Sequence, residues 1–160
     1  MAMLRELHIT NYAIIDKIDI EFNKGLNIIT GETGAGKSII AGALGLVLGT
    51  RADTSVLMDK ERKCLVEAIF DASDIQDVTS FLESQNIESD EELIIRREIS
   101  HNGKTRAFIN DTPANLSQLQ ELSSLLVDMH QQFDTLQLGQ QDFQIEVLDA
   151  LSSQLEEKKK

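Results

Sequence analysis

The stretch that decides the fold is Gly31-Glu32-Thr33-Gly34-Ala35-Gly36-Lys37-Ser38. It matches the phosphate-binding loop pattern, in which two glycines separated by four residues are followed by a lysine and a hydroxyl residue. Glycines let successive backbone N–H groups point inward at phosphate oxygens, and the N-terminus of the following helix adds the positive end of its dipole. The pattern therefore predicts a site for a nucleotide such as ATP.

The polar side chains of this loop have distinct predicted roles. Lys37 places an ammonium group on the phosphate oxygens, and we expect it to act in catalysis. The Ser38 hydroxyl can occupy one octahedral position on Mg²⁺, which makes Ser38 a predicted metal ligand. The predicted nucleotide-binding residues of the segment are Gly31, Glu32, Thr33, Gly34, Ala35, Gly36, Lys37, Ser38 and Ile39.

The residues on either side of the loop supply the context that the pattern requires. Residues 26–30 are a short, nearly continuous apolar run, which predicts a buried strand that leads into the glycines. Residues 38–48 carry small and apolar side chains almost all round, which favours a helix buried between other layers. We therefore expect a strand, the loop and a helix in that order.

Further elements are expected along the rest of the chain from apolar periodicity and turn signals. Alternating residues predict strands at 4–9, 14–22 and 62–71, and helical spacing predicts a helix over 75–85. Asn102-Gly103 predicts a hairpin between strands at 93–100 and 104–110. A capping box at Ser117-Gln118-Leu119-Gln120 predicts a helix start, residues 125–129 a buried strand, and residues 141–160 a helix leaving the body.

The amino-acid composition limits the classes of protein to which the chain can belong. The chain has 160 residues, of which 41% are hydrophobic, so we expect one domain or a piece of one. No apolar run or leader indicates a membrane, and we expect a soluble, cytoplasmic protein whose single cysteine, Cys64, packs in the core. The formal net charge of −12 opposes non-specific binding to DNA. A solvated face is therefore the favoured interpretation of the basic hairpin residues Arg96, Arg97, Lys104 and Arg106.

Nucleotide binding alone does not name the reaction, because hydrolysis also needs an acid for the metal and a base for water. Asp128, after the apolar residues 125–127, is the candidate acid of a self-contained phosphotransferase. The simpler interpretation is an Asp at a strand end, where such residues are common. A nucleotide-gated interaction module without catalysis is a third possibility.

Several segments together resemble the RecN family of DNA repair proteins, SMC-like relatives of ABC ATPases. The phosphate loop contributes, but the more specific segments are the arginine-rich hairpin and the Asp-x-His-x-Gln run. The matching segments are residues 11–16, 30–38, 49–53, 96–110, 116–119 and 126–132, in the same order as in the family. The resemblance thus covers essentially the whole chain.

The resemblance implies an α/β fold: the N-terminal lobe of an ABC/SMC-type P-loop ATPase head, with a mixed sheet and an antiparallel β-subdomain around the loop helix. Residues 1–140 would form this part of the head, and 141–160 would lead toward a coiled coil. The C-terminal half of the same head would supply the signature motif, a metal-holding Asp and a catalytic Glu. The chain is then incomplete without that half.

The resemblance also assigns residues outside the loop. Gln132 takes the Q-loop position, whose amide reaches Mg²⁺ and the attacking water, and Arg51 aligns with an arginine that reaches nucleotide in SMC heads. His130 matches a family histidine. Phe133-Asp134-Thr135 departs from the family's His-Glu-His, and Gln131 and Ala13 also differ from the usual residues.

The leading hypothesis is an ATP-binding half-head of a RecN-type ATPase acting in double-strand break repair and recombination. The resemblance implies that two protomers sandwich ATP between their heads, and that DNA is engaged by the full-length protein. The chain alone is expected to hydrolyse ATP only at background rate, because the acid and base of hydrolysis are absent from it.

Overall fold

A computed structural model of the chain describes residues 2–30, 34–52 and 54–127. The elements are strands with helices between some of them, and a helix follows the last described strand. In chain order they are β1 (Met3–Tyr12), β2 (Ile15–Glu21), α1 (Gly34–Val47), the 3-10 helix η1 (Thr54–Val56), β3 (Cys64–Asp71), α2 (Gln76–Ser84), β4 (Leu93–Ile99), β5 (Thr105–Ile109), β6 (Thr112–Ala114) and α3 (Leu116–Leu126).

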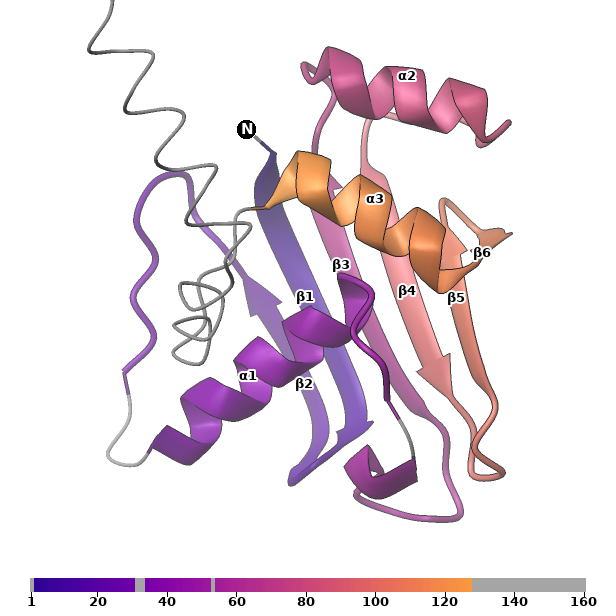
Figure 1. Cartoon of the computed structure of the whole chain (residues 1–160). Helices are drawn as coiled ribbons and strands as arrows, with labels where there is room; N and C mark the ends of the chain where they lie inside the picture. The colour runs from indigo at the N-terminus through magenta and orange to yellow at the C-terminus, as the bar shows by residue number, and fades with distance from the viewer. Residues whose placement is uncertain (1, 31–33, 53, 128–160) are drawn as a thin grey trace, which may run out of the picture. The chain divides into compact units, whose positions relative to one another are not determined.

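The strands form one sheet in the order β2-β1-β3-β4-β5-β6, and every described pair is antiparallel. Helices α1 and α3 cross the same face of this sheet, and α2 lies beside one end of it (Figure 1). This arrangement confirms the predicted antiparallel subdomain around the loop helix. The predicted strands at 4–9, 14–22, 62–71, 93–100 and 104–110 are also confirmed, as is the helix over 75–85.

The core lies between the sheet and its helices because the strands alternate in burial. β3 buries Cys64, Val66, Ala68 and Phe70, while the residues between them stay half-buried on the other face. Such alternation is what a sheet covered on one face requires. Cys64 is 1% exposed, which confirms its predicted place in the core.

Glycines allow α1 to pack closely and to end abruptly. A Cβ built on Gly42 would come within 2.6 Å of the Tyr12 hydroxyl oxygen, so the absence of a side chain lets α1 lie on β1. Gly49 adopts φ +97°, and the Thr50 N–H donates to the Gly45 carbonyl at 2.9 Å. Together with the Gly49 N–H bond to the carbonyl of Leu46 at 3.2 Å, this forms a Schellman motif, which satisfies carbonyls at the helix end.

The approach to the loop differs from the prediction. Residues 26–30 form no strand, and Leu26, Ile28 and Ile29 are 86%, 73% and 44% exposed. A strand needs hydrogen-bonding neighbours and covering side chains. No described strand pairs with this segment. Helix α1 is not buried all round either, since Lys37 and Ser38 are exposed and its fully buried residues lie in its C-terminal half.

Two boundaries near α3 also differ. The N-cap is Asn115, not Ser117: the Asn115 side chain accepts from the Gln118 N–H, and the Gln118 side chain accepts from the Asn115 N–H, both at 2.9 Å. Leu125 and Leu126 belong to the last turn of α3 and not to a strand, and their apolar character serves packing of the helix on the sheet. The expected boundary at 140/141 and the helix over 141–160 lie outside the described residues.

The hairpin through Asn102-Gly103 is confirmed with a longer loop. Ser100 pairs with Lys104 through a 2.9 Å backbone bond, and the Gly103 N–H donates to the Ser100 carbonyl at 2.9 Å. Gly103 has φ +81°, the left-handed conformation that glycine adopts without steric cost. The turn therefore needs a glycine at this position.

Candidate nucleotide site

The start of α1 carries the two polar side chains of the predicted phosphate site. The helix begins at Gly34, which places Lys37 and Ser38 near its N-terminal end, where both are exposed. The side chain of Ile39 is half-buried and packs against the core, and its contact with nucleotide stays a prediction. Residues 31–33, which include Gly31, Glu32 and Thr33, lie outside the described residues.

The chemistry of this helix end suits a polyphosphate with Mg²⁺. The first N–H groups of a helix have no partner within the helix, and the dipole favours negative charge there. The first turn of α1 contains no acidic residue that would compete. Lys37 adds a positive charge, and Ser38 adds a hydroxyl oxygen of the kind Mg²⁺ accepts as a ligand. The donors present therefore fit a magnesium nucleotide.

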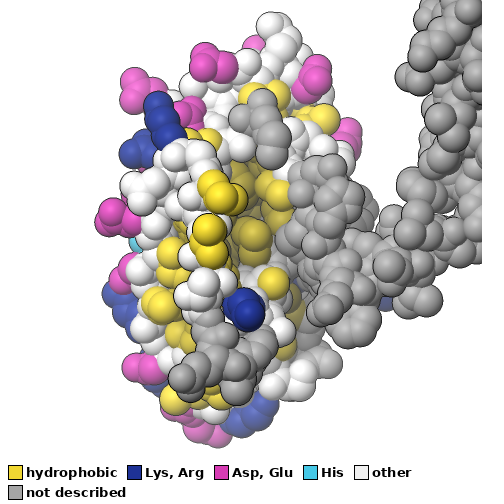
Figure 2. Space-filling model, turned by 90° about the vertical axis from the view of Figure 1, so that its left-hand side faces the viewer, with side chains coloured by type: hydrophobic (Ala, Val, Ile, Leu, Met, Phe, Trp, Pro, Cys, Tyr) yellow, Lys and Arg dark blue, Asp and Glu magenta, His cyan; other side chains and the backbone are white. Residues whose placement is uncertain are grey.

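The segment before the loop presents an apolar surface beside this helix end. Leu26 and Ile28 are among the exposed large hydrophobic side chains. Figure 2 shows hydrophobic side chains gathered in a band on this side of the molecule. Contiguous exposed apolar surface usually marks a place that another element or partner covers.

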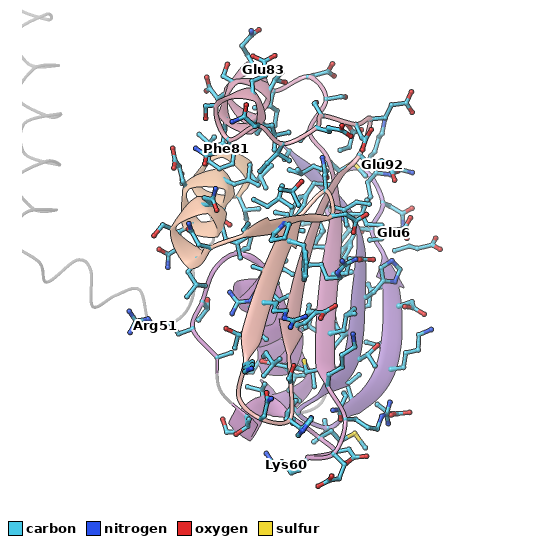
Figure 3. All side chains as sticks on the ribbon, turned by 90° about the vertical axis from the view of Figure 1, so that its right-hand side faces the viewer. Glu6, Arg51, Lys60, Phe81, Glu83 and Glu92 are labelled. Carbon is cyan, nitrogen blue, oxygen red and sulfur yellow. The ribbon has the colours of Figure 1, made fainter. Side chains whose placement is uncertain are left out.

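Arg51 lies at the other end of α1 from Lys37. It follows the Schellman motif, and with a rise of 1.5 Å per residue the helix separates the two ends by about 20 Å. Figure 3 shows Arg51 projecting away from the body on the helix side of the sheet. Within the described residues, the structure thus brings Lys37 and Ser38 together but does not bring Arg51 to them.

Asn11 holds the loop that follows η1, a role that was not among the predictions from the sequence. Its side chain is fully buried, and its amide donates to the carbonyls of Asp59 and Arg62 at 3.0 and 2.9 Å. Its side-chain oxygen accepts from the Asp59 N–H at 2.7 Å. Asn11 also has φ +54°, a conformation that asparagine tolerates better than most residues. The sequence signal that could have indicated this role was the position of an Asn at the end of a strand.

The basic hairpin residues do not form one patch. Arg96 faces the helix-free side, where Glu67, Glu98 and Asp111 lie 3.6, 3.7 and 3.1 Å from its nitrogens. Arg97 faces the helix-covered side and is 2% exposed. The expected solvated face is therefore wrong for Arg97, because successive residues of a strand point to opposite faces. Lys104 and Arg106 are exposed.

The other candidate residues near the end of the chain are not described. Asp128, His130, Gln131 and Gln132 lie outside the described residues, so their roles stay predictions. Within the described ranges, no group of three or more His, Cys, Asp or Glu side chains is placed to hold a metal ion. No helix in those ranges is long and apolar enough to cross a membrane.

Comparison with known proteins agrees with this geometry. A family model described as an AAA domain matches residues 6–160. The chain is 42% identical to the DNA repair protein RecN of Vibrio cholerae over 147 residues, covering 92% of this chain and 26% of that protein. It is 37% identical to RecN of Bacillus subtilis, again over 92% of this chain and 26% of that protein. The chain thus spans about a quarter of the length of these relatives.

The fold also has solved counterparts. An SMC ATPase, solved in a study of ATP-driven dimerization and DNA-stimulated activation, superposes with a TM-score of 0.64 at 18% identity. The match covers 92% of this chain and 97% of that one. At this identity the likeness concerns the fold, which is the predicted SMC type. The chain therefore belongs to the AAA domain family, with the fold of an SMC ATPase head and a sequence similar to RecN.

Proposed function

We propose that this chain is the ATP-binding part of a RecN-type ATPase that acts in the repair of DNA double-strand breaks and in recombination. The observation that carries the proposal is the placement of Lys37 and Ser38, both exposed near the start of a helix that opens with the glycine-rich loop. Similarity to RecN over 92% of the chain supports the biological role.

The loop residues and the first turn of α1 would hold the nucleotide. Lys37 compensates phosphate charge, the Ser38 hydroxyl is a ligand of Mg²⁺, and the backbone N–H groups at the helix start bind phosphate oxygens. Bound Mg²⁺ neutralises charge that develops on the phosphate oxygens. Arg51, at the far end of α1, would contact nucleotide as the matching arginine does in SMC heads.

The exposed residues 26–30 support the proposal that further polypeptide completes the head. Leu26 and Ile28 carry the side chains of a buried strand but are 86% and 73% exposed. Strands from the C-terminal half of the same head would pair with this segment and cover it. Because the RecN relatives are about three and a half times as long as this chain, they contain enough additional residues for such a half.

Two further partners belong to this proposal. A second protomer would form an ATP-sandwiched dimer of heads, as ATP-driven dimerization is described for the SMC ATPase of similar fold. DNA would be engaged by the full-length protein, because the net charge of −12 on this chain disfavours non-specific contact.

A phosphate-release assay tests the assignment of this chain as the binding part. We expect the 160-residue chain and its Lys37→Ala variant to show only the background rate. Robust turnover that Asp128→Asn abolishes would contradict the proposal and favour a self-contained phosphotransferase.

Gln132 provides a second test, in a protein of the length of the relatives. A neutral amide can bind Mg²⁺ or hold water without adding charge to the triphosphate site. Gln132→Ala should therefore keep ATP affinity within about tenfold while lowering hydrolysis strongly. Normal hydrolysis by this variant would refute the Q-loop assignment.

A further inference from the structure

Arg97 occupies a core position of β4. The strand buries Leu93, Ile95, Arg97 and Ile99 in strict alternation, so Arg97 points to the helix-covered face with its apolar neighbours. In the sheet register it lies beside Val66 of β3 and Ala107 of β5, both buried. Only 2% of Arg97 is exposed, which makes it the largest fully buried side chain of the described residues.

Two of the three guanidinium nitrogens of Arg97 have no hydrogen-bond partner among the described residues. Its Nε and Nη1 atoms are buried without a hydrogen bond, and no carboxylate lies within ion-pair distance of it. The adjacent Arg96 also has an Nε without a hydrogen bond, but three carboxylates lie 3.1 to 3.7 Å from its nitrogens and its guanidinium lies 4.7 Å from the ring centroid of Phe108.

An unpaired cation in the interior is unfavourable. Burial lowers the pKa of Arg97, but a guanidinium starts so high that it stays protonated at neutral pH. Arg97 therefore cannot lower the free-energy cost of its burial by losing a proton, whereas a buried lysine can. A buried charge of this kind persists in proteins when an opposite charge or a ligand satisfies it.

Arg97 is one of the residues that line an open cavity of about 450 Å³. Its walls come from β5, from β6 and from the segment that enters α3. The lining residues are Arg97, Thr105, Arg106, Ala107, Phe108, Pro113, Ala114, Asn115 and Leu116. A volume of this size is typical of sites for small organic molecules and far exceeds that of one water.

The electrostatics of the cavity favour an anion. Its lining holds two arginines, Arg97 and Arg106, and no Asp or Glu. Asn115 and Leu116 are the N-cap and first residue of α3, an 11-residue helix whose N-terminal end therefore opens at the wall. The helix dipole adds positive potential at this end. Ala107, Pro113 and Leu116 supply apolar surface for a carbon skeleton.

We propose that this cavity is a binding site for an organic oxyanion, whose carboxylate or phosphate group is held by the buried guanidinium of Arg97. A guanidinium donates charge-assisted hydrogen bonds to such a group, and these are stronger than hydrogen bonds between neutral partners. Arg106 at the rim attracts the anion, and the apolar wall contacts the rest of it. The site is distinct from the start of α1, and its existence does not depend on the nucleotide role proposed above.

Thermal unfolding with inorganic phosphate and with acetate as probes tests this site. The 160-residue chain is compared with Arg97→Met, which removes the charge at similar volume, at ionic strength balanced with sodium chloride. Arg62→Met is the matched control, since Arg62 is an exposed arginine paired with Asp16 at 2.7 Å.

We expect at least one probe to raise the unfolding midpoint of the unmodified chain and of Arg62→Met by a few degrees in a saturable manner, because a ligand stabilises the state that binds it. Arg97→Met should show no saturable rise and, without anion, should unfold at an equal or higher temperature. Equal responses of the unmodified chain and Arg97→Met would overturn the proposal, as would the absence of a saturable response in both.

A measurement on the unmodified chain covers the case in which Arg97→Met fails to fold. The Nε–H resonance of Arg97 in a nitrogen-15 spectrum should shift with phosphate or acetate and saturate at the concentration found from the midpoints. An unchanged resonance would overturn the proposal.

A titration of a protein with the length of the RecN relatives distinguishes two sources of the oxyanion. If the natural occupant is a free small molecule, the probe that acts on the short chain also stabilises the longer protein. If the natural occupant is an Asp or Glu side chain of the additional residues, the probe does not change the unfolding midpoint of the longer protein, and Arg97→Met lowers that midpoint.

Discussion

The hydroxyl oxygen of Tyr12 on β1 lies 2.6 Å from the position that a Cβ on Gly42 of α1 would occupy. This contact sets how closely the helix approaches the sheet. The next atom of Tyr12, Cζ, is 3.7 Å from the same position, which is an ordinary van der Waals distance. The hydroxyl group alone therefore excludes a side chain at Gly42. The contact between Tyr12 and Gly42 sets the position of α1, the helix that carries Lys37, on the sheet.

A double substitution tests this contact. Gly42→Ala should destabilise the chain by about 1 to 3 kcal/mol, because the added methyl group overpacks the interface. In a Tyr12→Phe background the same change should stabilise by up to about 1 kcal/mol, since alanine favours a helix over glycine and the clash is gone. Urea unfolding of the four proteins measures both values, and the same cost in both backgrounds would refute the contact.

Asn11 should be hard to replace. Asn11→Ala leaves two carbonyls and the Asp59 N–H without their side-chain partner, and we expect a loss of about 2 to 4 kcal/mol. Asn11→Gly is the control, because it keeps the positive φ but removes the same hydrogen bonds. It should lose nearly as much, with faster hydrogen exchange at the Asp59 amide in both variants. An unchanged rate of hydrogen exchange at the Asp59 amide would show that the Asn11 side chain does not hold this loop.

Cys64 gives the stability of the chain a dependence on alkaline pH. Burial raises the pKa of its thiol from 9.0 to about 11, so the folded state keeps the thiol neutral while the unfolded state ionises first. Stability from this group is fully present below pH 9 and declines as the pH rises from 9 to about 11. Cys64→Ala should flatten this decline in urea unfolding, and an unchanged slope would show that another group causes it.

Regular alternation made much of the fold predictable. β3 and β4 alternate buried and half-buried residues along their whole length, and the sequence shows this pattern directly. The inward orientation of Arg97 was available from the same signal, because it stands two residues from both Ile95 and Ile99. Grouping it with the other basic residues of the hairpin by charge, and not by strand face, concealed its place in the core.

Features that depend on competing local contacts were not predictable. Asn115 and Ser117 are both good N-cap residues, and each has a glutamine three residues later. The end of β6 at Ala114 decides in favour of Asn115, since the chain leaves the sheet there. The exposure of residues 26–30 depends on strands that the described residues do not contain, so an apolar run alone could not reveal it.

The affinity of the 160-residue chain for Mg·ATP, compared with that of Lys37→Ala, tests the central claim most directly. Lys60→Ala is the control, an exposed lysine whose Nζ donates to the Thr54 carbonyl at 2.6 Å in the loop before β3. The account predicts saturable binding that Lys37→Ala weakens at least about tenfold and Lys60→Ala leaves unchanged, because only Lys37 stands at the phosphate loop. Equal affinities of the unmodified chain and Lys37→Ala, or no saturable binding at all, would contradict it.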